Sequence, residues 1–112
     1  MSDLTQKYNE AEKLKDEGKY DEAVALLNEV LAEDADHVLT HLTLGRIFTL
    51  TAKFDLAIEH GQKACELEPS EPFNFTALSV TFQRAWAGTQ EQKYIQMAED
   101  AMAESRRLES LK

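Results

Sequence analysis

Two histidines lie four residues apart in a stretch whose apolar residues recur at helical intervals. His37 and His41 would project from one face of a helix, a spacing that can place two imidazoles on one metal ion. A zinc site needs a third and usually a fourth ligand, and no nearby residue supplies one at a motif spacing. Phe75 lies 34 positions after His41, which favours a packing role at both positions. We expect a partly buried structural His41, an exposed His60 and no metal.

Cys65 is the single cysteine, so an internal disulfide cannot form. It follows Ala64 in the last turns of an expected helix, and Glu66 is its other neighbour. Thiols of low pKa lie at helix N-termini or beside basic groups, and the sequence places neither near Cys65. We therefore predict a small packed residue. A metal- or redox-responsive module built from His37, His41 and Cys65 is the least favoured alternative.

No set of residues with catalytic spacing is present in the sequence. The chain lacks a nucleophile elbow, a glycine-rich phosphate loop and an HExxH motif. Its acidic residues are scattered at the spacing of a solvated helix surface. We therefore expect a protein that is not an enzyme and that needs no cofactor.

Charge and hydropathy restrict the partners. The 112 residues carry 21 acidic and 12 basic side chains, a net charge of −9, without a basic stripe. Nucleic-acid binding requires a basic footprint, so we expect no nucleic-acid partner. The N-terminal residues have no apolar signal region, and no apolar run approaches the roughly 20 residues that span a bilayer. These features predict a soluble, cytoplasmic chain that is not inserted in a membrane.

Apolar periodicity predicts an all-α fold without strands. Gly18 is expected to end the first helix in a positive-φ conformation. Pro72 suits the first turn of a fifth helix, which Gly88 would end. Thr89 and Gln92 would form a capping box that begins the sixth helix. The first four helices are expected at about positions 3–16, 21–32, 37–51 and 55–67.

Packing residues recur every 34 positions. Leu14, Phe48 and Phe82 form one series, and a series of small residues runs in parallel. A shared period of this length is typical of stacked helical hairpins. The small-residue series, which would allow the two helices of each hairpin to approach closely, is Ala11, Gly45 and Ser79, with Ala23 and Ala57 in the second helices.

The period fails in the last hairpin. Ala98 resembles Ala57 but lies 41 positions later, so seven extra residues follow Trp86. Seven residues are close to two helical turns and would lengthen each helix of the third hairpin by about one turn. Met97 is the alternative contact residue to Ala98.

Gly61 occupies the interior of a helix, where glycine costs about 1 kcal/mol relative to alanine. It takes the place that Leu27 holds in the first repeat. We expect it to make room for a bulky ring of the next repeat, namely Phe73, Phe75 or Trp86.

These units resemble the tetratricopeptide repeat (TPR). The second repeat carries the resemblance best, the first lacks the closing proline, and the third matches mainly in its first helix. The resemblance implies one domain over residues 1–112, an α-solenoid of three stacked antiparallel hairpins at about 3–36, 37–70 and 71–108, with the third elongated. The residues that carry it are Ala11, Leu14, Gly18, Tyr20, Ala23 and Leu27, then Leu44, Gly45, Phe48, Phe54, Ala57, Ala64 and Pro69, then Leu78, Ser79 and Phe82.

The resemblance also implies a concave groove lined by the first helix of each hairpin. Such a groove would be an apolar patch with two arginines, suited to an amphipathic helix or an extended apolar peptide. The arginines could hold a carboxylate. The chain would then be an adaptor or scaffold that binds a protein or peptide partner. The implied groove residues are Tyr8, Glu12, Lys15, Leu39, Leu42, Arg46, Thr49, Phe73, Thr76, Val80, Gln83 and Arg84.

One TPR subclass grips the C-terminal carboxylate of heat-shock chaperones with lysine, asparagine and arginine side chains. The matching positions here are Tyr8, Glu12, Thr43, Phe73 and Ala77, and none fits. We therefore expect a different kind of partner. The main alternative is a self-associating structural scaffold, a homo-oligomer, because the last helix has no clear polar cap.

Overall fold

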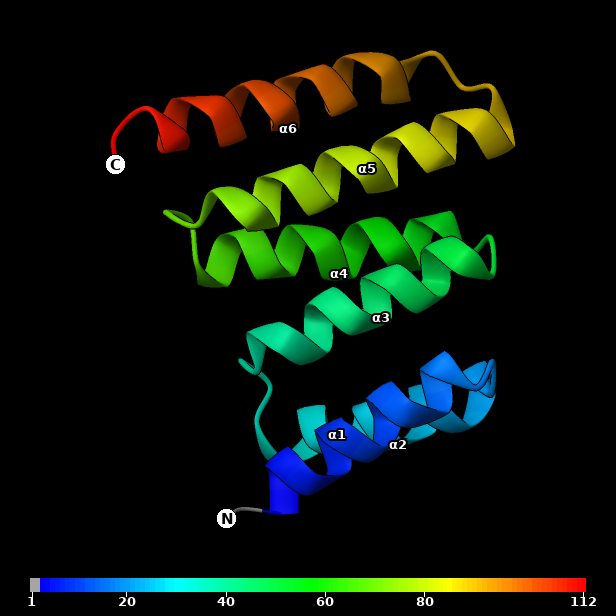
Figure 1. Ribbon diagram of the computed structural model, residues 1–112. Coiled ribbons are helices and arrows are strands. Elements are labelled where there is room, and N and C mark those ends of the chain that lie inside the picture. The colour runs from blue at the N-terminus through cyan, green and yellow to red at the C-terminus, as the bar shows by residue number, and fades with distance from the viewer. Residues whose placement is uncertain (1–2) are drawn as a thin grey trace.

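A computed structural model describes residues 3–112 as six α-helices arranged in three antiparallel hairpins that stack side by side (Figure 1). The described residues contain no strand. The predicted all-α solenoid, with an elongated third hairpin, is confirmed. The helices are α1 (Asp3–Asp16), α2 (Tyr20–Glu33), α3 (Val38–Leu50), α4 (Phe54–Leu67), α5 (Pro72–Thr89) and α6 (Lys93–Glu109).

Small residues set the distance between the two helices of each hairpin. Ala11, Ala23 and Ala57 are fully buried. A Cβ atom built on Gly45 would lie 3.5 Å from the backbone oxygen of Ala57, so the two backbones are already in contact. In the third hairpin the Ser79 hydroxyl donates a hydrogen bond of 2.8 Å to the backbone oxygen of Ala98. The predicted role in close helix approach is confirmed at Gly45 and Ser79.

Two apolar clusters bridge successive hairpins. The first joins α1 to α4 around Leu27, Leu44 and Ile47, which are almost completely buried. The second joins α4, α5 and α6. In it the rings of Phe82 and Tyr94 stack with centroids 6.2 Å apart. Each hairpin therefore buries its apolar side only by contacting a neighbour, as stacked repeats require.

Gly61 of α4 and Asn74 of α5 shape the junction between these two helices. Gly61 is buried, and a Cβ atom there would lie 3.0 Å from Cδ1 of Leu78. Gly61 does make room for the next repeat, but the neighbour is this leucine and not one of the predicted aromatic rings. The buried Asn74 amide donates hydrogen bonds of 3.3 Å to the backbone oxygens of Ala64 and Glu68, which caps the end of α4.

The elongation of the third hairpin differs in detail from the prediction. Helices α5 and α6 have 18 and 17 residues, against 13 and 14 for α3 and α4. The predicted stop at Gly88 is wrong, because α5 continues to Thr89. A Cβ atom on Gly88 would lie 2.5 Å from the Phe54 ring, so this glycine permits a close contact with α4. In α6, Ala98 faces the core and Met97 is 36% exposed, which decides the register in favour of Ala98.

The predicted capping box between Thr89 and Gln92 is also absent. The Thr89 hydroxyl donates to the backbone oxygen of Ala85 at 2.8 Å and accepts from the Glu91 amide. Gln92 makes no side-chain cap. Helix α5 ends at Thr89, and the next residue, Gln90, has a left-handed backbone with φ 62°.

The first two hairpin turns share one geometry although their residues differ. Gly18 has φ 78°, as predicted, and Ala52, at the equivalent position of the next repeat, has φ 61°. In both turns the next amide reaches back to an earlier carbonyl, from Lys19 to Leu14 and from Lys53 to Phe48, at 2.8 Å. This is the helix-ending arrangement that favours glycine.

Replacement of Ala52 by glycine should stabilise the protein by about 1 kcal/mol, because the left-handed conformation costs alanine roughly that much. The reverse change, Gly18→Ala, should destabilise it by a similar amount. Urea denaturation followed by circular dichroism measures both effects. A loss of stability in Ala52→Gly would contradict the assignment of backbone strain to this turn.

Replacement of Gly88 by alanine should destabilise the protein by about 1–3 kcal/mol through overpacking against Phe54. Helix propensity alone would favour alanine by about 1 kcal/mol, so the two effects have opposite signs. In a Phe54→Ala background the same change should become stabilising. An equal effect in both backgrounds, measured by urea denaturation, would show that the two residues do not interact.

Candidate functional site

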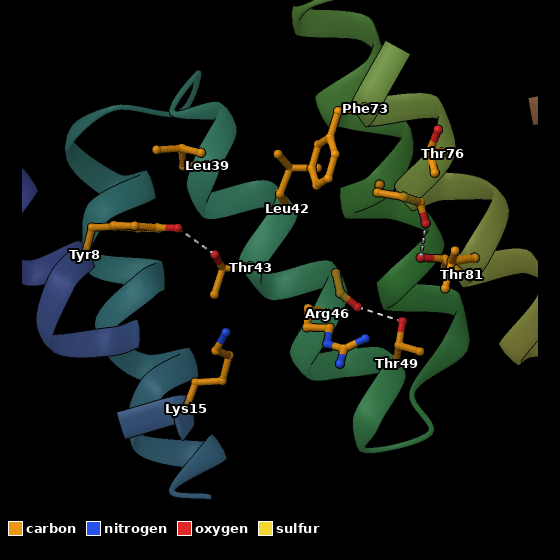
Figure 2. Close-up of a pocket in the computed structure, with 14 residues that line it drawn as sticks. Tyr8, Lys15, Leu39, Leu42, Thr43, Arg46, Thr49, Phe73, Thr76 and Thr81 are labelled. Carbon is orange, nitrogen blue, oxygen red and sulfur yellow. Dashed lines mark hydrogen bonds between the residues drawn. The ribbon is translucent and has the colours of Figure 1, made fainter. Parts of the chain in front are cut away.

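A cavity of about 480 Å³ opens on the side of the stack formed by α1, α3 and α5, with α4 behind it (Figure 2). We call it the groove. The structure brings most of the residues predicted for a concave site around this one cavity. Those that line it are Tyr8, Lys15, Leu39, Leu42, Arg46, Thr49, Phe73, Thr76 and Val80, together with Thr43, Gly45, Gly61, Ala77 and Thr81.

One half of the groove is apolar. Leu39 is 55% exposed and Phe73 is 61% exposed, and Leu42 lines the same cavity (Figure 2). Leu39 and Phe73 are 34 positions apart in the sequence, so successive hairpins place them at equivalent sites. Large apolar side chains gathered in a concavity and left in water are typical of an interaction site.

The other half is polar and holds one unpaired cation. The Arg46 guanidinium has no hydrogen bond or ion pair with any residue from 3 to 112. Lys15 is different, because its ammonium lies 3.2 Å from a carboxylate oxygen of Glu12 and 3.7 Å from Asp16. Glu12 does not line the groove but neutralises Lys15 from the same helix. The free positive charge in the groove is therefore that of Arg46.

Hydrogen bonding fixes the wall between α1 and α3. The Tyr8 hydroxyl and the Thr43 hydroxyl are 2.9 Å apart, and the Tyr8 and His37 rings lie with centroids 5.5 Å apart. Burial raises the pKa of Tyr8, against a smaller lowering by the Thr43 hydrogen bond, so the phenol stays neutral. Thr43 was not among the predicted groove residues, although its position one helical turn after Leu39 places it on the same helical face.

Arg84 lies elsewhere. It lines a second cavity of about 1250 Å³ between α5 and α6, which adjoins the groove at Val80. We call this the terminal cavity. Arg84 and Gln83, both predicted for the groove, line the terminal cavity and are not among the residues that line the groove.

The three histidines do not form one site. His37 caps α3, with Nδ1 at 2.7 Å from the Thr40 hydroxyl and 3.3 Å from its amide. His41 is 6% exposed and its Nδ1 lies 3.0 Å from Nδ1 of His60. His60 also stacks on Phe48, so the prediction that it is exposed is wrong: the α3–α4 contact half-buries it. Within residues 3–112 no three His, Cys, Asp or Glu side chains gather as a metal site.

Hydrogen-bond chemistry fixes the protons of the His41–His60 pair. His41 Nε2 lies 2.8 Å from the backbone oxygen of Ala35, which only accepts, so this nitrogen carries a hydrogen. In neutral His41 the Nδ1 atom then accepts, and His60 donates. Burial, followed by the neighbouring His41, lowers the pKa of His60 below its ordinary value of 6.5.

Stability should therefore depend on pH through His60. The unfolded chain binds a proton more readily at His60 than the folded chain. Neutral His60 therefore makes its full contribution to the free energy of unfolding above about pH 6.5. This contribution is lost as the pH falls from there towards the lowered pKa. We expect the urea midpoint to fall from pH 7.5 to pH 5.5, and to fall less in His60→Gln. His37→Asn, which keeps a capping side chain, is the control and should retain the wild-type slope. Identical slopes in wild type and His60→Gln would contradict the assignment.

Cys65 is buried in the second apolar cluster, as predicted for a small packed residue. Burial, together with the charge of Glu66, raises the pKa of its thiol to about 11. The sulfur is therefore protonated at neutral pH, which makes it a poor nucleophile and metal ligand.

Comparison with known proteins supports the repeat assignment. Residues 14–60 match the family model described as tetratricopeptide repeat. No curated protein matches the sequence. No helix within residues 3–112 has the length and apolar character needed to cross a bilayer.

Several solved structures share the fold. A thermophilic TPR protein from Thermus thermophilus superposes with a TM-score of 0.80 at 17% identity, over 94% of this chain and 56% of that one. MamA AMB-1 gives 0.67 at 20% identity, over 89% and 59%. The Yersinia enterocolitica type III secretion chaperone SycD, in complex with a peptide of the translocator YopD, gives 0.66 at 18% identity, over 97% and 95%. The chain thus spans little more than half the length of the first two.

Proposed function

We propose that this chain, which belongs to the tetratricopeptide-repeat family, is a protein-interaction module that binds a peptide or helix of a partner protein in the groove. The observation that carries the proposal is the exposure of Leu39 and Phe73 around a single concavity. Apolar side chains of this size, gathered in one place and left in water, are typical of a surface that a partner covers. Adaptor or scaffold activity follows from such binding without chemistry.

The groove favours a ligand of mixed character. An apolar side chain of the ligand would pack between Leu39, Leu42 and Phe73, and a carboxylate would pair with the free guanidinium of Arg46. The two features lie on successive turns of α3, so both are within reach of one short segment. SycD, which has the same fold, was solved with a bound peptide, and this supports a peptide ligand here.

No enzymatic role is part of this proposal. The groove side chains are apolar groups, hydroxyls, a tyrosine that burial keeps neutral, and cations. None of them is a nucleophile with a base beside it. We further propose a protein partner in the cytoplasm; the net charge of −9 argues against nucleic acid and against an anionic membrane surface as the partner.

The test is affinity capture of partners from the native lysate, followed by mass spectrometry. Leu39→Glu combined with Phe73→Glu should reduce capture of the groove partner at least about tenfold, because each buried apolar side chain contributes roughly 1.5–3 kcal/mol. Arg46→Glu should weaken it less.

The matched control is Leu50→Glu. Leu50 lies on α3 with 49% exposure but lines neither the groove nor the terminal cavity. It should capture partners as wild type does. Equal capture by the groove variant and the wild type, with both folded by circular dichroism, would remove the proposal.

A further inference from the structure

Two residues that line the groove are smaller than their equivalents in the preceding repeat. Gly61 and Thr81 both line the groove. The residues 34 positions earlier are Leu27 and Ile47, which are at most 1% exposed and belong to the first apolar cluster. Large side chains therefore fill this part of the first junction between hairpins, whereas at the second junction the cavity reaches a glycine and a threonine.

Gly61 leaves space on the side of α4 that borders the groove. Apart from the local backbone, only Cδ1 of Leu78 lies within 4 Å of a Cβ atom built on Gly61, at 3.0 Å. A larger side chain at this position would occupy space that now belongs to the cavity. We call the part of the groove bordered by Gly45, Gly61, Ala77 and Thr81 the recess.

The hydroxyl groups of the groove are already engaged in hydrogen bonds (Figure 2). Thr49 donates to the backbone oxygen of Gly45 at 2.8 Å, and Thr81 donates to that of Ala77 at 3.1 Å. Each bond uses the only hydrogen of its hydroxyl, so these two threonines keep no donor for a ligand. The recess therefore suits an apolar side chain. The other hydroxyl pairs of the lining are Tyr8 with Thr43 at 2.9 Å and Thr76 with Ser105 at 2.6 Å.

The charge beside the recess is positive. Arg46 follows Gly45 in the sequence, and its guanidinium has no partner among residues 3–112. No acidic side chain is among the described residues that line the groove. Glu12 and Asp16 pair with Lys15 and not with Arg46. A carboxylate of the ligand is therefore the complement of Arg46.

We propose that the groove selects an extended segment of its partner by two side chains. One is an apolar side chain of about the size of leucine, which enters the recess, and the other is a carboxylate, which pairs with Arg46. Gly61 and Thr81 set the size of the apolar side chain, which makes them specificity-determining residues. This inference rests on the proposed function and narrows its ligand to one class of peptide.

The size of the cavity favours an extended segment over a helix. A helix with its side chains is about 10–12 Å across and rises about 5.4 Å per turn, so a cavity of about 480 Å³ would hold only about one turn of it. An extended segment rises about 3.3 Å per residue and turns alternate side chains to one face. Residues i and i+2 of such a segment lie about 7 Å apart on the same face, which suits a recess and a long cationic side chain on consecutive residues of α3.

The probe is a pair of synthetic peptides, Ac-Gly-Ser-Leu-Ser-Asp-Ser-Gly-NH2 and the same peptide with alanine in place of leucine. Both termini are blocked, so that aspartate supplies the only carboxylate. Titration of the ¹⁵N-labelled protein, followed by NMR, measures even millimolar dissociation constants. The amides of Gly45, Arg46 and Gly61 should shift with saturation. The leucine peptide should bind at least about tenfold more tightly than the alanine peptide, as burial of one leucine side chain implies.

Variants that fill the recess test its role. Thr81→Ile installs the residue of the equivalent position in the first junction, and Gly61→Ala adds one methyl group next to the flexible end of Leu78. Each should reduce the preference for leucine over alanine to less than about threefold and leave binding of the alanine peptide unchanged. Two variants on different helices keep the test valid if one of them fails to fold by circular dichroism.

Thr89→Ile is the matched control. Thr89 is also on α5, and its hydroxyl donates to the backbone oxygen of Ala85 at 2.8 Å, as that of Thr81 does to Ala77. Thr89 does not line the groove, so this variant should keep the tenfold preference for leucine.

The contribution of Arg46 is tested by a double-mutant cycle. Replacement of aspartate by asparagine in the leucine peptide should weaken binding to the wild type by about threefold or more, as loss of a charged partner does. In Arg46→Gln the two peptides should bind equally. The same loss in both proteins would show that the carboxylate does not pair with Arg46.

Three results would overturn the inference. They are the absence of saturable shifts at the recess, equal affinity of the leucine and alanine peptides, and a preference for leucine that survives both recess-filling variants. The proposed function is judged separately, by capture of partners with the Leu39→Glu and Phe73→Glu variant. A partner that this variant loses and that Thr81→Ile retains in full would leave the proposed function intact and remove the recess as its determinant.

Discussion

Close approach of the two helices of each hairpin is the constraint on which the rest of this structure depends. It needs a residue almost without a side chain at one position of each first helix, which Ala11, Gly45 and Ser79 provide. A tightly closed hairpin cannot cover both of its apolar faces, so one apolar face of each hairpin remains uncovered. That side is buried only by the next hairpin, so the fold must be a stack, and the two apolar clusters lie between hairpins.

Stacking fixes what the surface can do. The repeat period places equivalent positions of α1, α3 and α5 side by side, so that one series of helical positions becomes one wall of the groove. Leu39 and Phe73 meet there because of this register. Arg46 is left unpaired, whereas its equivalent in the first hairpin, Glu12, pairs with Lys15. The repeat therefore places the apolar side chains together, and the change from Glu12 to Arg46 at equivalent positions adds a free positive charge beside them.

At the two junctions between hairpins, different side chains donate hydrogen bonds to backbone carbonyl groups. A helix that ends inside a packed stack leaves carbonyl groups that must find donors. His41 donates to the oxygen of Ala35 after α2, and Asn74 donates to the oxygens of Ala64 and Glu68 at the end of α4. The use of histidine at the first junction brings His60 into the interior as a partner for its second nitrogen. His60 is therefore a half-buried titratable group at the position that the partly buried Leu26 holds in the first repeat.

The sequence by itself determined the repeat architecture, the helix order and the small-residue contacts, because all of these follow from periodic spacing within one repeat length. The residues predicted for the groove came from the resemblance to the tetratricopeptide repeat. It also predicted the extra length of the third hairpin from a seven-residue slip. Tertiary structure alone decided the rest. Gly88 was expected to end a helix and instead admits the Phe54 ring, and the bulky neighbour of Gly61 proved to be Leu78. His60 was expected in water and lies against His41 and Phe48. Arg84 lines the terminal cavity and not the groove. These outcomes depend on contacts between side chains that are distant in the sequence. Local sequence patterns do not determine such contacts.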